Sequence, residues 1–183
     1  ARLDESSQLE VAWTDVGALV RDVVDDARVL HADHPIDLEI DPSGGPAQLG
    51  AEVNAPRLSE AVRNLVANAG RHTPAGTPIT VSVRRATGIG PQGERTPAIA
   101  IAVHDDGPGI PAEQQRFVFE RFYRGSDARA SGRTGSGLGL AIVQAIAEAH
   151  AGSVELESAP GLGTTVTISV PWITTLISMN SGA

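Results

Sequence analysis

The sequence has no cysteine and no lysine, and its 183 residues include only two tryptophans, one tyrosine and three phenylalanines. The lack of cysteine excludes disulfide bonds, thiolate zinc sites and cysteine nucleophiles. Because all 14 basic residues are arginines, any cationic contact to a phosphate must use a guanidinium. No apolar run reaches the roughly 18 residues that suggest a transmembrane helix, and no leader-like segment opens the chain, so we expect neither a membrane span nor a signal peptide.

The formal net charge of −8 argues against nucleic-acid binding, for which a basic surface is typical. The length fits one domain, and 41% hydrophobic residues is typical of a globular protein. The basic residues are unevenly distributed, because five arginines fall within 18 residues, and a local anion site is therefore compatible with the acidic whole. These are Arg116, Arg121, Arg124, Arg129 and Arg133.

The hydropathy pattern predicts three main helices and about five strands. Apolar residues at helical spacing follow the capping residue Asp15, and similar patterns cover 55–71 and 137–149. A shorter helix is expected from Pro111 to about Tyr123. Alternating segments predict strands at 36–40, 79–85, 98–104, 153–157 and 165–170. Because strands arrive in hairpin-like pairs, the pattern favours an α/β sandwich, with a mixed sheet of about five strands covered on one face by three helices.

Two asparagines near the end of the second predicted helix form the first candidate site. Asn64 and Asn68 are four residues apart and therefore share one helix face, which Arg71 extends. An asparagine oxygen is a neutral ligand that can hold Mg²⁺ already bound to phosphates. The same stripe is also explained by a solvated helix face, and its spacing alone does not decide between the two.

A glycine-containing turn after a predicted strand forms the second candidate site. It consists of Asp105-Asp106-Gly107-Pro108-Gly109-Ile110. A carboxylate at a strand end can accept a hydrogen bond from an adenine amino group, and the glycines allow close approach of the backbone. The same letters also make a good turn with no ligand.

The third candidate site is the segment that leads into the third predicted helix, Gly135-Ser136-Gly137-Leu138-Gly139. A helix start presents free N–H groups and a positive dipole end to phosphate. The glycine spacing and the lack of a preceding strand argue against a dinucleotide fingerprint, and a Walker loop would need lysine. Before this segment, the aromatic cluster at 117–123 fits either a core or a hinge of a mobile lid. Gly163-Thr164 alone indicates a turn.

In this order and at these separations, the segments resemble the ATP-binding domain of bacterial sensor histidine kinases, in the superfamily shared with gyrase, Hsp90 and MutL. The resemblance covers about residues 14–172. It rests on an asparagine box (64–74), two glycine boxes (105–111 and 135–140), a phenylalanine box (119–124) and the Gly163-Thr164 pair. It implies a Bergerat-type fold that binds ATP between sheet-side loops and a flexible lid at about 125–134.

The resemblance also implies roles for individual residues. Asn68 would be the magnesium ligand, Asn64 its neighbour at the phosphates, and Asp105 the reader of the adenine amino group. Asn64, Asn68 and Arg124 would form the catalytic set, with Arg124 reaching the γ-phosphate. The other expected nucleotide contacts are Arg71 at phosphate, His72, Gly109 and Ile110 at the base, and Gly107, Gly135, Ser136, Gly137, Leu138, Gly139 and Thr164.

ATPases of this superfamily resemble one another in a water-activating glutamate at the position of Asn64. Because an amide cannot act as a general base, the resemblance favours a histidine kinase domain that presents the γ-phosphate to a histidine on a separate dimerisation domain. None of the five histidines has the acceptor context, so we do not expect this chain to phosphorylate itself. The alternatives are a superfamily ATPase and an adenine-nucleotide sensor without phosphotransfer.

The resemblance further implies how the chain fits a larger protein. Residues 1–13 are expected to end an upstream helical dimerisation domain, and residues 173–183 to form a loose tail that need not belong to the natural sequence. The expected cofactors are ATP and Mg²⁺. The expected partners are the upstream histidine-containing domain and a response regulator, without nucleic acid or direct membrane contact. The expected location is cytoplasmic, within a parent protein anchored in the cell membrane.

Overall fold

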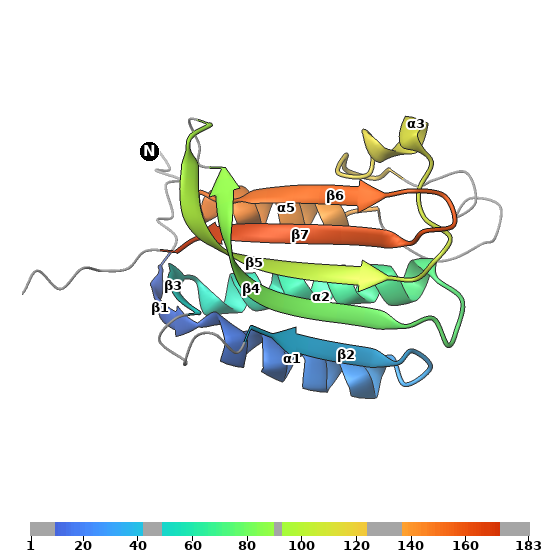
Figure 1. Cartoon of the computed structure of the whole chain (residues 1–183), viewed down its shortest axis with the longest axis horizontal. Helices are drawn as coiled ribbons and strands as arrows, with labels where there is room; N and C mark the ends of the chain where they lie inside the picture. The colour runs from blue at the N-terminus through green and yellow to red at the C-terminus, as the bar shows by residue number, and fades with distance from the viewer. Residues whose placement is uncertain (1–9, 42–48, 90–92, 124–136, 173–183) are drawn as a thin grey trace, which may run out of the picture.

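The computed structural model describes residues 10–41, 49–89, 93–123 and 137–172. Five strands form one mixed sheet in the order β2-β4-β5-β7-β6 (Figure 1). β2 pairs with β4 in parallel, whereas the other neighbours in this sheet are antiparallel. This arrangement confirms the predicted mixed sheet. The strands are β2 (Ile36–Ile40), β4 (Ile79–Ile89), β5 (Arg95–Asp105), β6 (Ser153–Ser158) and β7 (Thr164–Pro171).

Three helices cover one face of this sheet and lie behind it in Figure 1. They are α1 (Val16–Leu30), α2 (Ala55–His72) and α5 (Gly139–Ala149). Their apolar faces and the inward side chains of the strands form one continuous core, because successive strand residues point to opposite faces of the sheet. Val166, Ile168 and Val170 of β7 are buried in that core, while the residues between them are only half-buried. The predicted layer architecture is therefore confirmed.

The first two helices begin where the sequence supplies a cap. The Asp15 carboxylate accepts a hydrogen bond from the amide of Ala18 at 3.0 Å, and the Asn54 side chain accepts one from the amide of Arg57 at 3.0 Å. Pro56 lies in the first turn of α2, where a missing N–H costs no helical hydrogen bond. These caps satisfy backbone donors that the helix itself leaves unpaired.

Two short strands were not predicted from the sequence. β1 (Ala12–Asp15) and β3 (Gly50–Val53) pair in antiparallel register as a separate two-stranded sheet. The Trp13 ring packs against Gly50, where a Cβ would lie 2.5 Å from a ring carbon. Strands of four residues give too little alternation to be distinguished from loop, and their pairing depends on residues distant in the sequence.

The helix predicted from Pro111 to about Tyr123 is wrong in length. α3 covers only Ala112–Gln115, and the chain continues in turns whose amides bond three residues back, as from Phe117 to Gln114. Phe122 has a φ of 66°, a left-handed conformation that ends any helix. The third long helix begins at Gly139 instead of Gly137, because Gly137 has a φ of 67°.

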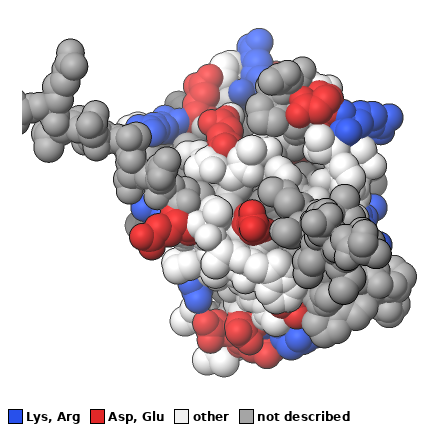
Figure 2. Space-filling model, turned by 90° about the vertical axis from the view of Figure 1, so that its left-hand side faces the viewer, with Lys and Arg blue, Asp and Glu red and all other residues white. Residues whose placement is uncertain are grey.

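In the described part of the chain, no helix is long and apolar enough to cross a membrane. Figure 2 views the end of the molecule that carries β1 and β3. Acidic and basic side chains are interspersed on this face around a largely uncharged centre, without a continuous basic patch.

Candidate functional site

One end of the molecule collects segments that are far apart in the sequence. The C-terminal half of α2, the end of β5, α3 and the turn between β6 and β7 all lie at the right-hand end of Figure 1. The end of β5 is joined to β7 because Asp105 pairs with Thr164 in the strand register. The predicted adenine-binding loop and the predicted Gly163-Thr164 pair therefore belong to one site.

Asn64 lies against the start of α5. A Cβ on Gly139 would be 3.6 Å from the Asn64 Oδ1 atom, so the amide oxygen faces the first residue of that helix. The amide nitrogen of Asn64 donates to the Glu60 carbonyl at 3.0 Å, which fixes the side-chain orientation. The structure thus brings together one residue of the predicted asparagine box and one of the predicted phosphate-binding segment.

Asn68 lies one helical turn beyond Asn64 and is half-buried. Its side chain makes no hydrogen bond with any of the residues that the structure describes, so its oxygen can accept a ligand. Arg71 and His72 are exposed in the last turn of α2. The helix therefore presents two amides and two basic side chains toward its C-terminal end, and the roles expected for them stay predictions.

Asp105 is buried, with only 8% of its surface exposed, at the last position of β5. Desolvation by burial raises the pKa of this carboxyl above its ordinary value of 3.8, and the amide of Gly107, which donates to Oδ1 at 3.0 Å, opposes part of that shift. A buried carboxylate with few donors is an effective acceptor for a ligand amino group. This environment fits the role expected for Asp105.

The loop after Asp105 is attached to the end of β6 through Ser158. The Ser158 hydroxyl accepts from the amide of Ile110 at 2.8 Å and donates to the carbonyl of Gly163 at 2.9 Å. Gln115 donates to the carbonyls of Ile110 and Ser158, both at 2.8 Å. The predicted base-lining residue Ile110 is therefore held from two sides before any ligand binds.

Two glycines permit close backbone contacts around this loop. Gly163 has a φ of 78°, and a Cβ there would overlap the carbonyl oxygen of Asp105. Gly109 has a φ of 73°, and a Cβ there would overlap the carbonyl oxygen of Ala159. Both positions need glycine for its conformation and for its lack of a side chain.

The predicted phosphate side is described only in part. Leu138, the residue before α5, has an apolar side chain, so the first-turn amides of α5 receive no cap from it. The carbonyl of Gly137 accepts from the amide of Phe122 at 2.8 Å, which joins the aromatic segment to the helix start. Arg124, Gly135, Ser136 and the predicted lid at 125–134 lie outside the described residues.

The aromatic cluster contributes only partly to the core, and its interpretation as a hinge stays a prediction. Phe119 packs partly against the main core. Phe117 and Tyr123 stack with their ring centroids 5.7 Å apart, and Phe122 is 71% exposed. The cluster therefore contacts the core at one residue and places the others next to Gly137, at the border of the segment that was predicted to be a lid.

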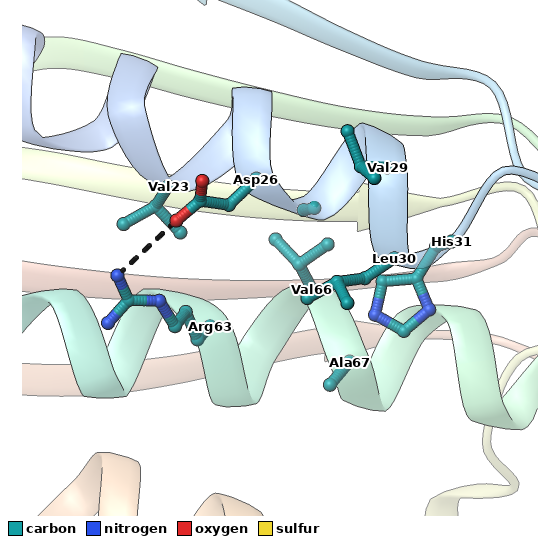
Figure 3. Close-up of a pocket in the computed structure, with 9 residues that line it drawn as sticks. Val23, Asp26, Val29, Leu30, His31, Arg63, Val66 and Ala67 are labelled. Atoms are coloured by element: carbon teal, nitrogen blue, oxygen red, sulfur yellow. Dashed lines mark ion pairs between the residues drawn. The ribbon is translucent and has the colours of Figure 1, made fainter.

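A separate pocket of about 370 Å³ lies between α1 and α2 (Figure 3). It is lined mainly by apolar side chains such as Leu30 and Val66, and Arg63 points toward Asp26 across it, with 3.6 Å between the charged atoms. None of the predicted site residues lines this pocket. Because the amides and the buried carboxylate lie elsewhere, their chemistry identifies the functional site better than the volume of this pocket does.

Three residues that the sequence analysis missed help to build the site. Ser158 and Gln115 hold the loop after β5, and Thr73, at the end of α2, places its methyl group where a Cβ on Gly107 would be 2.5 Å away. A single serine, glutamine or threonine carries no pattern of its own. Only the strand register, which places Ser158 opposite Thr164, indicates that the end of β6 belongs to the site.

The fold and this arrangement agree with a match between residues 53–173 and the model of one protein family, described as the histidine kinase-, DNA gyrase B- and HSP90-like ATPase family. The match covers more than half of the chain. The chain therefore belongs to this family, and it is a catalytic ATP-binding domain of the sensor histidine kinase type.

Among curated proteins, the chain is similar to mycobacterial sensor histidine kinases. The chain is 41% identical over 161 residues to the probable sensor histidine kinase TcrY of Mycobacterium tuberculosis and 40% identical over 172 residues to the sensor-like histidine kinase SenX3 of Mycolicibacterium smegmatis. The matches cover 88% and 93% of this chain, but only 31% and 42% of those two relatives. The chain thus spans less than half the length of the curated relatives it matches.

Solved structures show the same fold. A mycobacterial sensor histidine kinase, MprB, superposes with a TM-score of 0.68 at 25% identity over 88% of this chain and 97% of that one. Full-length ShkA, solved in complex with AMPPNP, gives a TM-score of 0.71 at 22% identity over 89% of this chain and 31% of ShkA. The likeness to ShkA concerns the fold alone, and these neighbours confirm the Bergerat-type architecture expected from the sequence.

Proposed function

We propose that this domain binds Mg²⁺·ATP at the end of the molecule where α2, β5 and α5 meet, and presents the γ-phosphate to a histidine on a separate domain. The observation that carries this proposal is that α2 contacts two distant parts of the sequence: Asn64 lies beside Gly139, and Thr73, which ends the helix, lies beside Gly107 in the Asp105 loop. Base and phosphates would lie at opposite ends of the C-terminal half of α2.

The residues present fit a nucleotide-bound magnesium ion. Asn68 offers a half-buried neutral oxygen that is not engaged by other described residues. Within the described ranges there is no group of three or more His, Cys, Asp or Glu side chains that could hold a metal. Asn68 would therefore supply one ligand to an ion that arrives with the phosphates, where the ion would neutralise phosphate charge.

Phosphoryl transfer requires mainly positioning and charge stabilisation from the protein. The first-turn amides of α5, which lack a side-chain cap, would bind phosphate oxygens, and Asn64 would fix the distance between that helix and the asparagine stripe of α2. Asp105 would hold the base and so set the direction in which the phosphates extend. Arg124 would reach the γ-phosphate, as the family resemblance implies.

Asn64 distinguishes kinase from ATPase chemistry. Its amide cannot remove a proton from water, and its nitrogen already donates to the Glu60 carbonyl. We therefore expect ATP hydrolysis close to background, with the γ-phosphate retained for an acceptor histidine. That acceptor would belong to an upstream dimerisation domain, and a response regulator would take the phosphoryl group from it.

Calorimetric titration of Mg²⁺·ATP into the chain tests this proposal. We expect saturable binding in the micromolar range, no continuing heat of turnover, and affinity at least about tenfold lower in Asn68→Ala, because a metal ligand is lost. Arg63→Ala is the matched control, since Arg63 is on the same helix but faces α1 and pairs with Asp26.

The outcomes separate the alternatives. Continuing heat of hydrolysis would favour the ATPase interpretation in spite of Asn64. Equal affinity in wild type and Asn68→Ala would remove Asn68 from the site. Stable label on this chain from γ-labelled ATP would contradict the need for a separate acceptor domain, because none of its histidines has the expected context.

A further inference from the structure

His34 is a buried histidine with both ring nitrogens in defined surroundings. It lies in the segment between α1 and β2 and is 6% exposed. Its Nε2 is 3.0 Å from the Thr73 hydroxyl, which donates its one proton to the Ala69 carbonyl at 2.9 Å. Because a hydroxyl has a single proton to give, Nε2 of His34 must carry a proton and donate it to Thr73.

The second ring nitrogen faces a negative charge. Nδ1 lies 3.1 Å from an Asp33 carboxylate oxygen, within ion-pair distance although not aligned as a hydrogen bond. The His34 side chain is the largest cause that lowers the pKa of Asp33. The ring is therefore flanked by Asp33 on its Nδ1 side and by Thr73 on its Nε2 side. The other titratable side chains nearby in sequence are His31, in the same segment, and His72, which precedes Thr73.

Thr73 transmits the position of His34 to the nucleotide site. Its methyl carbon lies where a Cβ on Gly107 would be only 2.5 Å away, so it abuts the turn after β5. The amide of Gly107 is the donor that fixes the Asp105 carboxylate at 3.0 Å. Because Thr73 is held by two hydrogen bonds, its methyl group cannot move away from Gly107 without breaking one of them.

We propose that His34 is a positioning residue for base recognition, acting through Thr73 and Gly107 on Asp105. The proposal rests on the proposed function, in which Asp105 reads the adenine amino group. It adds a residue 71 positions upstream of Asp105 that touches no nucleotide. His34 thereby determines how well the site distinguishes adenine from a purine without the amino group.

The experiment compares Mg²⁺·ATP with Mg²⁺·purine riboside triphosphate, which lacks the 6-amino group, on wild type, His34→Leu and His34→Gln. We expect His34→Leu to lose about fivefold in ATP affinity while affinity for the second nucleotide is unchanged, since one supporting hydrogen bond is removed. His34→Gln can still donate to Thr73 and should recover most of this loss. His31→Gln is the matched histidine control.

Thr73→Ser provides a second variant, should His34→Leu fold poorly. It retains the hydroxyl that receives the His34 proton but removes the methyl group beside Gly107, and we expect the same base-specific loss.

Several results would overturn the proposal. Equal losses for both nucleotides would indicate that His34 only supports the fold. If wild type binds ATP but the variants still distinguish ATP from purine riboside triphosphate as well as wild type does, the proposal for His34 is wrong and the proposed function stands. If wild type does not bind ATP, the proposed function is wrong as well.

Discussion

The two sides of the candidate site are built differently. The adenine side consists of the end of β5, its following loop and the β6–β7 turn, and these are joined by side-chain and backbone hydrogen bonds through Ser158 and Gly107. The phosphate side consists of the start of α5, where Leu138 gives no side-chain cap, together with the amides of α2. Among the described residues, hydrogen bonds hold the proposed adenine side in place, whereas Leu138 leaves the first amides of α5 without a side-chain cap.

This difference has a physical reason. Base recognition requires a buried acceptor at a fixed place, and a sheet edge with close backbone contacts can supply it. Phosphate recognition requires free N–H groups, which a helix start has only when no side chain caps it. We therefore expect changes that disrupt the close backbone contacts of the adenine side to reduce stability, and changes on the phosphate side to reduce affinity for phosphates with little loss of stability.

The largest effect is expected for Gly163→Ala. The added Cβ would overlap the carbonyl of Asp105 in a left-handed conformation, and separating β5 from the turn should cost more than about 3 kcal/mol in free energy of unfolding. Gly161→Ala is the control, because Gly161 has the same φ of 78° but no neighbour within 4 Å of the added atom. It should lose only about 1 kcal/mol.

Urea denaturation of the two glycine variants measures this contrast directly. If both variants lose the same free energy of unfolding, the close contact with Asp105 contributes nothing, and strain in the left-handed backbone conformation explains both losses. A stable Gly163→Ala protein that binds ATP normally would contradict the proposal that the end of β5 and the β6–β7 turn bind the adenine base.

Asp105→Asn should affect binding and stability in opposite directions. Replacing the carboxylate weakens the acceptor for the adenine amino group, and we expect ATP affinity to fall roughly 10- to 100-fold. The amide of Gly107 can still donate to the asparagine oxygen, so the loop should remain in place. Calorimetry of ATP and of purine riboside triphosphate separates loss of base recognition from general damage.

The raised pKa of Asp105 sets the pH dependence of stability. Because folding favours the protonated form, its stabilising contribution is full below about pH 3.8 and is lost as pH rises through the higher folded-state pKa. Asp105→Asn should therefore match wild type in acid and become the more stable protein toward neutral pH. Urea denaturation at several pH values measures this, and a variant that is less stable at pH 7 would contradict burial as the dominant cause.

The smallest effect is expected for Gly139→Ala. An added Cβ would make an ordinary 3.6 Å contact with Asn64 Oδ1, and alanine favours a helix over glycine, so stability should not fall. The methyl group narrows the approach of phosphate to the first amides of α5, and we expect ATP to bind about fivefold more weakly while adenosine is unaffected. Equal losses of affinity for ATP and adenosine would contradict the assignment of the start of α5 to the phosphates.

Long amphipathic elements were predicted well from the sequence because their pattern is local. The cap at Asp15 and the predicted span of 55–71 agree with α1 and α2 to within a residue or two. The hairpin of β4 and β5 was predicted too short, because Gly88 and Pro97 are loop signals that the paired register overrides. The pair β1 and β3 was missed, since four-residue strands depend on a distant partner.

The candidate site was predicted from motif order more than from chemistry. Asn64, Asp105 and Gly139 were identified, and the structure places Asn64 beside Gly139 and gives the Asp105 carboxylate a donor in Gly107, while their roles stay predictions. Their supports, Ser158 and Thr73, could not be found, because a single hydroxyl has no periodicity and its partners are fixed only by tertiary contacts. His34 was missed for the same reason.

The most direct test of the central claim is a titration of ¹⁵N-labelled chain with Mg²⁺·AMPPNP, followed by amide spectra. We expect saturable shifts at Asp105 and Gly107 on the proposed adenine side and at Gly139 on the proposed phosphate side. Leu30 and Val66, which line the pocket between α1 and α2, should stay unchanged. Shifts confined to that pocket, with Gly107 and Gly139 unaffected, would contradict the placement of the nucleotide.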